Sequence, residues 1–465
     1  MSEAVTRPAT IRTGLLPSLE PLLREWLPRQ RWFAGKGRPV TGLSLVAETE
    51  LVPPTGRLSL HHLLVRAHQP STLGAPTHPG DCYQLLIGAR EALPPHLAPA
   101  LIGHVQEGPL AGRTVYDALY DTRPAELLLE ALRNRARVGV LRFDGEPGRE
   151  IRSGLVPRLV TSEQSNSSVV YGDTFILKLL RRVVPGVNPD LELPLALARE
   201  GCARVPEPTA WIRAEVDGAA PEPYVLGVLQ PFVQGAADGW ELALSELAKG
   251  EDFTAEARAL GRATAEVHTA LAAALPTVTL GHAQLEPLVA GMRERLDAAA
   301  QAVPALRPYA PGLRTAFDAL AGLAAEGQTW TAQRIHGDLH LGQCLRSPSG
   351  RWSLIDFEGE PAKPLAERRM PQPTVRDVAG MLRSFDYAAH SVNPPAPDWA
   401  HACRSAYCAG YAEAGGRDPR TDPVLLRAYE TDKAVYEVVY EARHRPDWLP
   451  VPLSAVHRLA SPDLS

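Results

Sequence analysis

Arg334-Ile-His-Gly-Asp-Leu-His-Leu-Gly-Gln343 decides the fold of this chain, together with Leu354-Ile-Asp-Phe-Glu-Gly-Glu-Pro361. The first stretch is a polar loop with a glycine, and in the second two apolar residues lead into an acid. A carboxylate that orients a hydroxyl, and oxygen ligands for magnesium, are most of what phosphoryl transfer needs from a protein. The pattern therefore indicates a kinase of a small hydroxylated substrate, with Asp338 as the catalytic residue and Gln343 and Asp356 as magnesium ligands.

The composition is typical of a globular protein with more than one domain. The chain has 465 residues, 45% of them hydrophobic and 22% charged, with a formal net charge of -5. This balance disfavours nucleic-acid binding, and neither a signal peptide nor an apolar run of about 18 residues is recognisable. The five cysteines lack zinc-type spacing and suggest reduced thiols. We expect a cytoplasmic monomer that binds neither nucleic acid nor a membrane.

The N-terminal third predicts a small antiparallel sheet with one helix, followed by further helical and strand segments. The expected helix covers 15–28, and apolar or alternating runs predict strands at 43–47, 58–65 and 82–87. We assign 1–90 to an N-terminal cap domain and 91–157 to an intermediate subdomain. The turn at 30–37 carries basic side chains that could bind an anion. The simpler interpretation is that its apolar side chains pack into a small core while the basic ones remain solvated.

The pattern of residues 158–234 predicts an antiparallel sheet that binds a nucleotide. This prediction depends mainly on Lys178. This lysine follows three apolar residues in a strand, where it needs anionic partners unless it reaches the surface. An ATP phosphate and Glu192 of the next helix would supply them. The connector that follows the sheet could hold an adenine or be an ordinary loop. The nucleotide-binding candidates are Ser165, Asn166, Ser167, Ser168, Lys178, Glu192, Gln230, Phe232 and Val233.

Residues 235–465 predict a mainly helical unit with good helix formers at 255–275 and 288–302. A late helix at 427–443 places three tyrosines and a lysine on one face, which could line a sugar pocket or pack on the core. Arg383 could contact a ligand or anchor a helix, Asp377 could cap its helix or anchor the catalytic loop, and His268 is expected to be a packing or surface residue. The substrate-binding candidates are Asp338, His336, Arg383, Lys433, Tyr436 and Tyr440.

The catalytic stretch resembles the aminoglycoside-phosphotransferase branch of the protein-kinase-like fold, and more narrowly the bacterial maltokinase family. The resemblance runs over essentially the full length of the chain. The narrower resemblance is carried by Gln30-Arg-Trp-Phe-Ala-Gly-Lys-Gly37, Gly235-Ala-Ala-Asp-Gly-Trp240, Leu365-Ala-Glu-Arg-Arg369 and Arg376-Asp-Val-Ala-Gly-Met-Leu-Arg-Ser-Phe-Asp-Tyr387.

The resemblance implies an α+β, bilobal protein-kinase-like fold, with an antiparallel-sheet N-lobe and a helical C-lobe after an α/β cap domain. It implies ATP and Mg2+ as cofactors and phosphorylation of maltose at its anomeric hydroxyl to maltose 1-phosphate, for glycogen and α-glucan synthesis. A trehalose synthase is a candidate partner. Asp338 would be the catalytic aspartate, and Lys178 would hold phosphate with Glu192 as its ion-pair partner.

Two departures from protein kinases stand out: the loop 164–168 has no GxGxxG, and the metal motif reads Asp-Phe-Glu instead of Asp-Phe-Gly. Two alternatives stay open at this point. The first is a kinase of another small sugar, such as glucosamine, or of an aminoglycoside on the same scaffold. The second is a non-catalytic, pseudokinase-like protein that senses a sugar.

Overall fold

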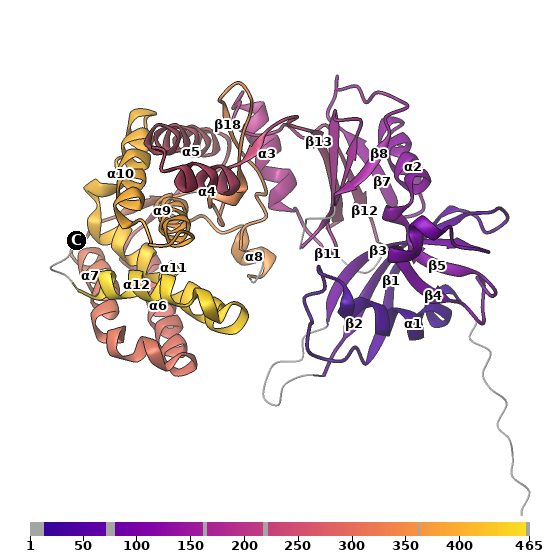
Figure 1. The fold of residues 1–465 in the computed structure, drawn as a ribbon, viewed down its shortest axis with the longest axis horizontal. Helices are drawn as coiled ribbons and strands as arrows, with labels where there is room; N and C mark the ends of the chain where they lie inside the picture. The colour runs from indigo at the N-terminus through magenta and orange to yellow at the C-terminus, as the bar shows by residue number, and fades with distance from the viewer. Residues whose placement is uncertain (1–13, 71–79, 161–164, 217–221, 361–362, 462–465) are drawn as a thin grey trace, which may run out of the picture. The chain divides into compact units, whose positions relative to one another are not determined.

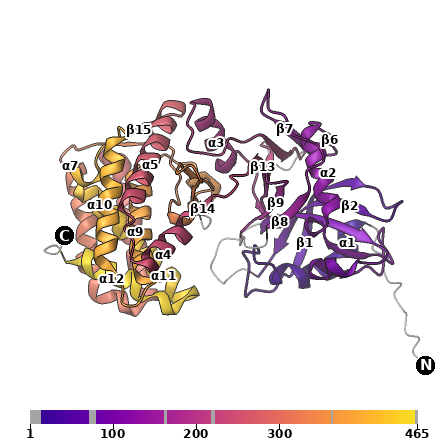
Figure 2. The same cartoon turned by 45° about the horizontal axis from the view of Figure 1, so that its top comes forward.

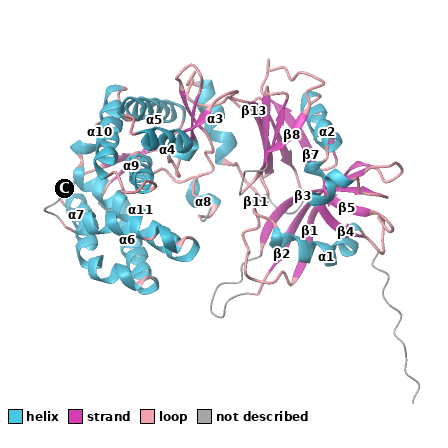
Figure 3. Cartoon of the chain, viewed as in Figure 1, coloured by secondary structure: helices cyan, strands magenta, loops and turns pink. Residues whose placement is uncertain are grey.

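The computed structural model describes residues 14–70, 80–160, 165–216, 222–360 and 363–461 (Figure 1). The chain forms two compact units. The N-terminal unit comprises Met1–Leu191 and Glu207–Phe232, and the C-terminal unit comprises Glu192–Pro206 and Val233–Ser465. One boundary between them therefore falls at Phe232 and Val233, in the connector that follows the second sheet. Figure 3 shows that strands dominate the first unit and helices the second.

The cap sheet has the strand order β1-β2-β3-β5-β4, and α1 (Leu15–Trp26) packs on one of its faces. The predicted helix and the three predicted strands are confirmed. β4 and β5, from the range expected to form the intermediate subdomain, also belong to this sheet, and so does the short strand β11. The strands are β1 (Gly42–Val52), β2 (Ser59–His68), β3 (Asp81–Arg90), β4 (Leu101–His104), β5 (Thr114–Asp117) and β11 (Arg182–Val183).

The second sheet is entirely antiparallel, with the order β6-β7-β12-β13-β10-β9-β8, and α2 (Thr122–Arg133) packs against it. It contains the predicted nucleotide-binding strands, so the antiparallel kinase-like sheet is confirmed. Its strands are β6 (Arg137–Val138), β7 (Leu141–Gly145), β8 (Pro157–Val160), β9 (Ser167–Tyr171), β10 (Phe175–Leu179), β12 (Ala210–Ala214) and β13 (Tyr224–Pro231). Helix α3 (Pro189–Arg199) follows and crosses from the N-terminal into the C-terminal unit.

The C-terminal unit is built from helices around two apolar cores. One core lies between α5, α9 and α10, and the other between α6, α7, α11 and α12. The helices are α4 (Gly239–Lys249), α5 (Thr254–Ala274), α6 (His282–Ala302), α7 (Ala310–Ala325), α8 (Leu365–Arg368), α9 (Val375–His390), α10 (Pro397–Glu413), α11 (Pro423–His444) and α12 (Pro450–Ala460). The helical character expected from the sequence is confirmed, and the chain has the predicted α+β fold.

Helices α5 and α10 lie side by side in Figures 1 and 2 because two glycines allow their backbones to touch. A Cβ atom on Gly261 would collide with the carbonyl oxygen of Tyr407, and one on Gly410 with that of Arg258. This close approach brings side chains of α10 onto the α5 face that supports the catalytic loop.

Small two- and three-stranded sheets complete the C-terminal unit and carry the ends of the catalytic stretch. They consist of β15 (Val278–Leu280) with β16 (Trp330–Ala332), and β14 (Ala237–Asp238) with β17 (Cys344–Arg346) and β18 (Trp352–Leu354). Among the described helices, none has the length and apolar character needed to cross a bilayer.

Candidate active site

The catalytic loop lies between β16 and β17 and is held by a carboxylate from the first turn of α9. Asp377 is 1% exposed and accepts hydrogen bonds from the backbone nitrogens of His336 and Gly337, both at 2.8 Å. Gly337 has φ 85°, a conformation that glycine adopts without steric cost. Of the two roles expected for Asp377, cap or loop anchor, these contacts identify the anchor.

Asp377 is itself fixed by a buried chain of side chains. Its Oδ2 lies 3.0 Å from Nε2 of His268, whose Nδ1 lies 2.8 Å from the Tyr411 hydroxyl. A carboxylate only accepts hydrogen bonds, so the Nε2 of His268 donates to Asp377. Burial alone would raise the pKa of Asp377, but the bonds from His268 and the backbone hold that pKa below its usual value. His268 is therefore a packing histidine, as expected.

His336 was predicted to bind substrate, and the structure corrects this. Its side chain is 1% exposed, and its Nε2 lies 2.8 Å from the carbonyl oxygen of Ile355. Its ring also packs against Phe357 at a centroid distance of 4.7 Å. The buried imidazole joins the catalytic loop to the residue that follows β18. The sequence could not show which of several polar groups in the loop turns inward.

Asp338 lies in a pocket of the C-terminal unit, beside Lys433 of α11. The Lys433 Nζ lies 3.3 Å from the Asp338 Oδ1. Burial by itself raises the pKa of Asp338, but the cation of Lys433 and the nearby imidazoles of His340 and His336 together outweigh this effect, and the pKa is lowered overall. Likewise, burial lowers the pKa of Lys433, while Asp338 and nearby acids raise it above its usual value. Asp338 is therefore ionised at neutral pH and can accept a hydrogen bond from a substrate hydroxyl.

We expect Lys433→Met to move the acid limb of the kcat/KM profile to higher pH. The lysine cation favours the ionised form of Asp338, so removing it raises the pKa of this carboxylate. Asp338 is therefore protonated at a lower pH in the wild type than in the variant. Nearby opposite charges shift a pKa by about one to three pH units, so a shift of about one unit is expected. An acid limb at the same pH in both proteins would contradict the assignment.

Asp356 and Gln343 are adjacent and carry the oxygen atoms expected of magnesium ligands. The Gln343 Nε2 donates to the Asp356 Oδ2 at 3.0 Å, and Ile355 donates through its backbone to the Gln343 carbonyl at 3.0 Å. Asp356 has φ 65°, a conformation that is uncommon outside glycine and that is often found at functional sites. A carboxylate oxygen of Glu358 lies within 4.8 Å of one from Asp356. This hard oxygen set fits Mg2+ chemically.

In the N-terminal unit, Lys178 lies on β10 and its predicted partner is corrected. Its Nζ pairs with the Asp190 Oδ2 at 2.8 Å, near the start of α3. Glu192, two residues further along this helix, pairs instead with Arg334 at 2.6 Å and with Arg369 at 3.7 Å. The helix was identified correctly, but the residue on it was not, because the sequence does not specify which side of the first helical turn faces the strand.

The predicted nucleotide loop is described from Ser165 onward, and Gln164 lies outside the described residues. The side chains of Asn166, Ser167 and Ser168 are buried. At the other end of the sheet, Gln230 lies on β13, and Phe232 donates through its backbone nitrogen to the Thr174 carbonyl at 2.9 Å. The nucleotide-binding roles of these residues and of Val233 stay predictions.

The acceptor pocket beside Asp338 contains some of the predicted residues and several that the sequence did not reveal. Lys433 and Tyr436 line it as predicted, while Tyr440 is 40% exposed and is not among the lining residues. Tyr440 and Tyr436 stack, with their ring centroids 6.2 Å apart. The full lining is Arg295, Gly337, Asp338, Leu339, Glu360, Lys363, Arg376, Asp377, Gly380, Tyr429, Asp432, Lys433 and Tyr436.

Arg383 was predicted to bind substrate, and the structure favours the anchoring alternative. Its guanidinium is 1% exposed and pairs with Glu437 at 2.9 Å and with Asp386 at 2.6 Å. The two carboxylates hold it inside the helical unit, so the substrate role is corrected to one of joining α9 to α11.

Glu360 and Arg376 of the pocket lie inside motifs that the sequence had already singled out, so their presence in the catalytic stretch was an available signal. The sequence contained no comparable signal for Arg295 and Asp432. These residues lie on α6 and α11, and the packing of the two helices brings the Arg295 Nε to 2.9 Å from the Asp432 Oδ1.

The anchored loop with Asp338, the adjacent side chains of Gln343 and Asp356, and the antiparallel sheet with an ion-paired lysine are the features of a kinase-like phosphotransferase. Comparison with known proteins agrees. The model of the phosphotransferase enzyme family matches residues 158–417, more than half of the chain, and the model of the maltokinase N-terminal cap domain matches residues 26–121. The chain therefore belongs to the phosphotransferase enzyme family and carries the cap domain of maltokinases, which places it among the sugar kinases.

Named relatives of the chain are sugar kinases as well. A glucosamine kinase of Streptacidiphilus jiangxiensis is 32% identical over 325 residues, covering 63% of this chain and 71% of the relative. A glucosamine kinase of Mycolicibacterium smegmatis is 30% identical over 342 residues, covering 65% and 79% respectively. A solved structure of a glucosamine kinase with glucosamine, ADP and inorganic phosphate has a TM-score of 0.65 and 25% identity, covering 93% of this chain and 98% of that one.

Proposed function

We propose that the protein transfers the terminal phosphoryl group of ATP to the anomeric hydroxyl of maltose, giving maltose 1-phosphate and ADP. Asp338 orients the attacking hydroxyl, and Lys178 contacts the phosphates of the nucleotide. Asp356 and Gln343 would hold Mg2+, which neutralises charge on the phosphates when it is bound. Association with a trehalose synthase stays a prediction.

The observation that carries the choice of acceptor is the charge pairing in the pocket beside Asp338. Each of its four carboxylates already has a protein partner with a proton to donate, so each is satisfied without a cationic ligand. The pairs are Asp338 with Lys433 at 3.3 Å, Glu360 with Arg376 at 2.9 Å, Asp432 with Arg295 at 2.9 Å, and Asp377 with His268 at 3.0 Å. A pocket of paired charges offers donors and acceptors to a neutral polyhydroxylated ligand.

Two further features support maltose in particular. The cap-domain match at 26–121 is to maltokinases, and the stretches 365–369 and 376–387 resemble the same family. Tyr436 offers an aromatic ring beside Lys433 in the pocket, with the ammonium 5.3 Å from the ring centroid. Such a ring suits the C–H face of a sugar.

Phosphorylation of glucosamine is the second candidate, and the named relatives favour it. At neutral pH an amino sugar brings an ammonium group into the pocket. That ammonium would need a carboxylate without a cation, or would have to displace Lys433 or Arg376 from its partner. Desolvating an unpaired charge is costly, so the paired pocket argues for a neutral acceptor.

A panel of acceptors tests the proposal. ADP release is measured with maltose, glucose, glucosamine and an aminoglycoside at fixed ATP and Mg2+, and kcat/KM is compared. We expect kcat/KM for maltose to exceed kcat/KM for glucosamine by about tenfold or more, which is the effect of leaving one polar group unpaired in a binding site. A larger kcat/KM for glucosamine would establish the second candidate and exclude the first.

A further inference from the structure

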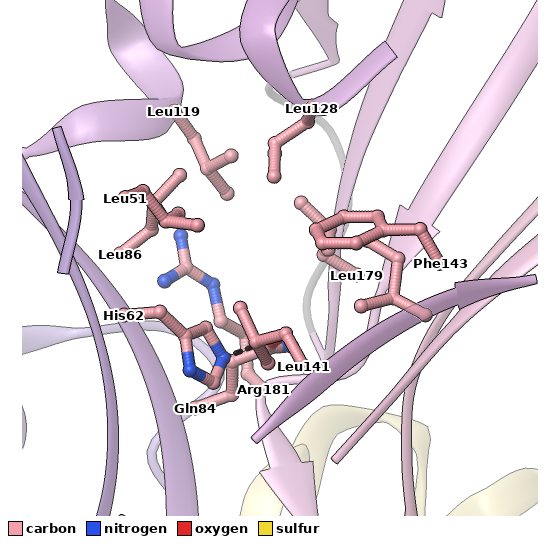
Figure 4. Close-up of a pocket in the computed structure, with 11 residues that line it drawn as sticks. Leu51, His62, Gln84, Leu86, Leu119, Leu128, Leu141, Phe143, Leu179 and Arg181 are labelled. Carbon is pink, nitrogen blue, oxygen red and sulfur yellow. Dashed lines mark hydrogen bonds between the residues drawn. The ribbon is translucent and has the colours of Figure 1, made fainter. Parts of the chain in front are cut away.

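The two units contain cavities of very different size. Figure 4 shows one in the N-terminal unit, where the His62 Nε2 lies 2.9 Å from the Gln84 Oε1. Its volume is about 20 Å³, enough for about one water molecule. In the C-terminal unit a cavity of about 940 Å³ lies between α7, α9, α10, α11 and α12. Sites for small molecules have volumes of roughly 300–1,000 Å³, so this larger cavity has the size of a ligand site.

The larger cavity, called the arginine cavity below, is separate from the acceptor pocket. No described residue lines both. Helix α9 contributes to each: Asp377 and Gly380 line the acceptor pocket, and Leu382, Asp386 and Ala389 line the arginine cavity. At about 100° per residue, these two sets of positions lie on opposite sides of the helix. A ligand in the arginine cavity would therefore not occupy the place of the sugar.

Ion pairs hold four of the five arginines that line the arginine cavity. Asp386 is the centre of this network. Its Oδ2 accepts hydrogen bonds from the side chains of Arg383 at 2.6 Å, Arg458 at 3.2 Å and Arg404 at 3.4 Å. The fourth, Arg420, pairs at 2.8 Å with a carboxylate two residues before it. These pairs fix guanidinium groups on the wall, so a ligand would meet donors that are already in place.

Arg427 is the fifth arginine, and it has no carboxylate partner within the described ranges. Its Nε and Nη2 both donate to the Leu459 carbonyl oxygen, at 3.3 Å and 2.8 Å, which leaves Nη1 over. Arg458, the residue before Leu459, forms its described ion pairs through Nη2 alone, which leaves Nε and Nη1. The two arginines thus lie on neighbouring parts of the wall with donors to spare. A half-buried cation without a counter-charge favours an anion.

Much of the remaining wall is apolar. Helix α7 contributes Ala316 and Ala319, α11 contributes Val424, and α12 contributes Val451 and Ala455. Apolar walls with a few fixed polar groups are typical of sites for organic ligands. An inorganic ion would leave these side chains in contact with water, whereas a carbon skeleton would cover them and gain free energy from their burial.

We propose that the arginine cavity is a second ligand site that binds an organic phosphate. The phosphate lies between Arg427 and Arg458, and the carbon skeleton packs on the apolar wall. A phosphate monoester offers three terminal oxygens, and guanidinium groups match its geometry with paired N–H donors. A carboxylate offers two oxygens and satisfies fewer of the donors that these two arginines leave over. The inference goes beyond the proposed function, because binding at this site needs no turnover.

Calorimetry on the full-length protein, with phenyl phosphate as the probe, tests the ligand class. ADP and Mg2+ are present at saturating concentrations, so that the nucleotide site is filled. The comparison compounds are inorganic phosphate, benzyl alcohol and benzoate. We expect the Kd of phenyl phosphate to be lower than each of the others by about tenfold or more, since each lacks either the ring or the full set of phosphate oxygens. Equal or tighter binding of any comparison compound would overturn the assignment to an organic phosphate.

Arg427→Met and Arg458→Met test the location of the site. Arg427→Met leaves every ion pair of the network in place, and in Arg458→Met the Asp386 carboxylate keeps Arg383 and Arg404. Each substitution should raise the Kd of phenyl phosphate about tenfold, as for a lost hydrogen bond to a charged group. If Arg458→Met lowers the thermal midpoint strongly, Arg427→Met decides the outcome. An unchanged Kd in Arg427→Met would overturn the inference.

Two control variants separate the arginine cavity from the rest of the C-terminal unit. Arg293→Met removes a cation from the ion pair with the exposed Asp318, and Lys433→Met removes the cation of the acceptor pocket. Both should keep the Kd of phenyl phosphate within about twofold, since neither residue shares a partner with Arg427. A Kd that rises in Lys433→Met and not in Arg427→Met would place the phosphate in the acceptor pocket and overturn the inference. Equal effects of Arg293→Met and Arg427→Met would also overturn it.

Discussion

Replacing Asp338 with asparagine is expected to lower kcat by about three orders of magnitude, the range for loss of a carboxylate that orients and deprotonates a substrate hydroxyl. The amide keeps the size of the side chain but loses the negative charge that accepts the hydrogen bond of the substrate hydroxyl. It also leaves Lys433, now 3.3 Å from a neutral oxygen or nitrogen, without its counter-charge. Sugar binding, measured by calorimetry, should be weakened far less than kcat, because the other pocket residues are unchanged.

Asp318→Asn is the control for this experiment. Asp318 lies on α7 of the same unit, its side chain is 52% exposed and it pairs with Arg293. Exposed ion pairs contribute about 0–1 kcal/mol, so this variant should keep the kcat of the wild type. Turnover by Asp338→Asn within about tenfold of the wild type would remove Asp338 from the catalytic role. It would favour the non-catalytic, sugar-sensing alternative.

Replacing Asp356 with asparagine is expected to lower kcat about a hundredfold or more and to raise the Mg2+ concentration needed for half-maximal rate. An amide oxygen carries no net charge and binds Mg2+ more weakly than a carboxylate. Gln343→Ala removes the neutral ligand and should shift the same Mg2+ dependence by a smaller factor. The measurement is initial rate against free Mg2+ at saturating ATP and sugar. An unchanged Mg2+ dependence in Asp356→Asn would contradict the metal-ligand assignment.

Most of the fold could be predicted from local patterns. The helix at 15–28, the cap strands, and the strands around Lys178 follow from apolar periodicity, which depends on residues close in sequence. Anchoring of the catalytic loop was one of two roles considered for Asp377, and its contacts with His336 and Gly337, 41 and 40 residues earlier in the chain, decide between them. The helical C-terminal unit follows in the same way from its helix formers.

Predictions that depended on partner choice were less successful. Lys178 pairs with Asp190 and not Glu192, His336 bonds to Ile355, and Arg383 is enclosed by two carboxylates. In each case the element that carries the residue was identified, but which groups a side chain meets is set by how the elements pack. A polar residue in a motif can equally face a ligand or hold the motif in place, and spacing alone does not distinguish the two.

For Ser167, the sequence contained a signal for the direction of its side chain. On a strand, residues of equal parity share a face, and Ser167 shares its face with Val169 and the fully buried Tyr171 of β9. This alternation places its hydroxyl on the inner face, where the Arg181 Nε donates to it at 2.8 Å. Arg181 itself carried no such signal, because its partner Asp117 lies far away in the sequence.

The most direct test of the account is the structure of the product. The purified protein is incubated with ATP, Mg2+ and maltose, and the product is read by phosphorus and proton NMR. The account predicts maltose phosphorylated on its anomeric carbon, with one ADP formed for each phosphate transferred. Maltose recovered unchanged, while glucosamine is phosphorylated under the same conditions, would contradict it.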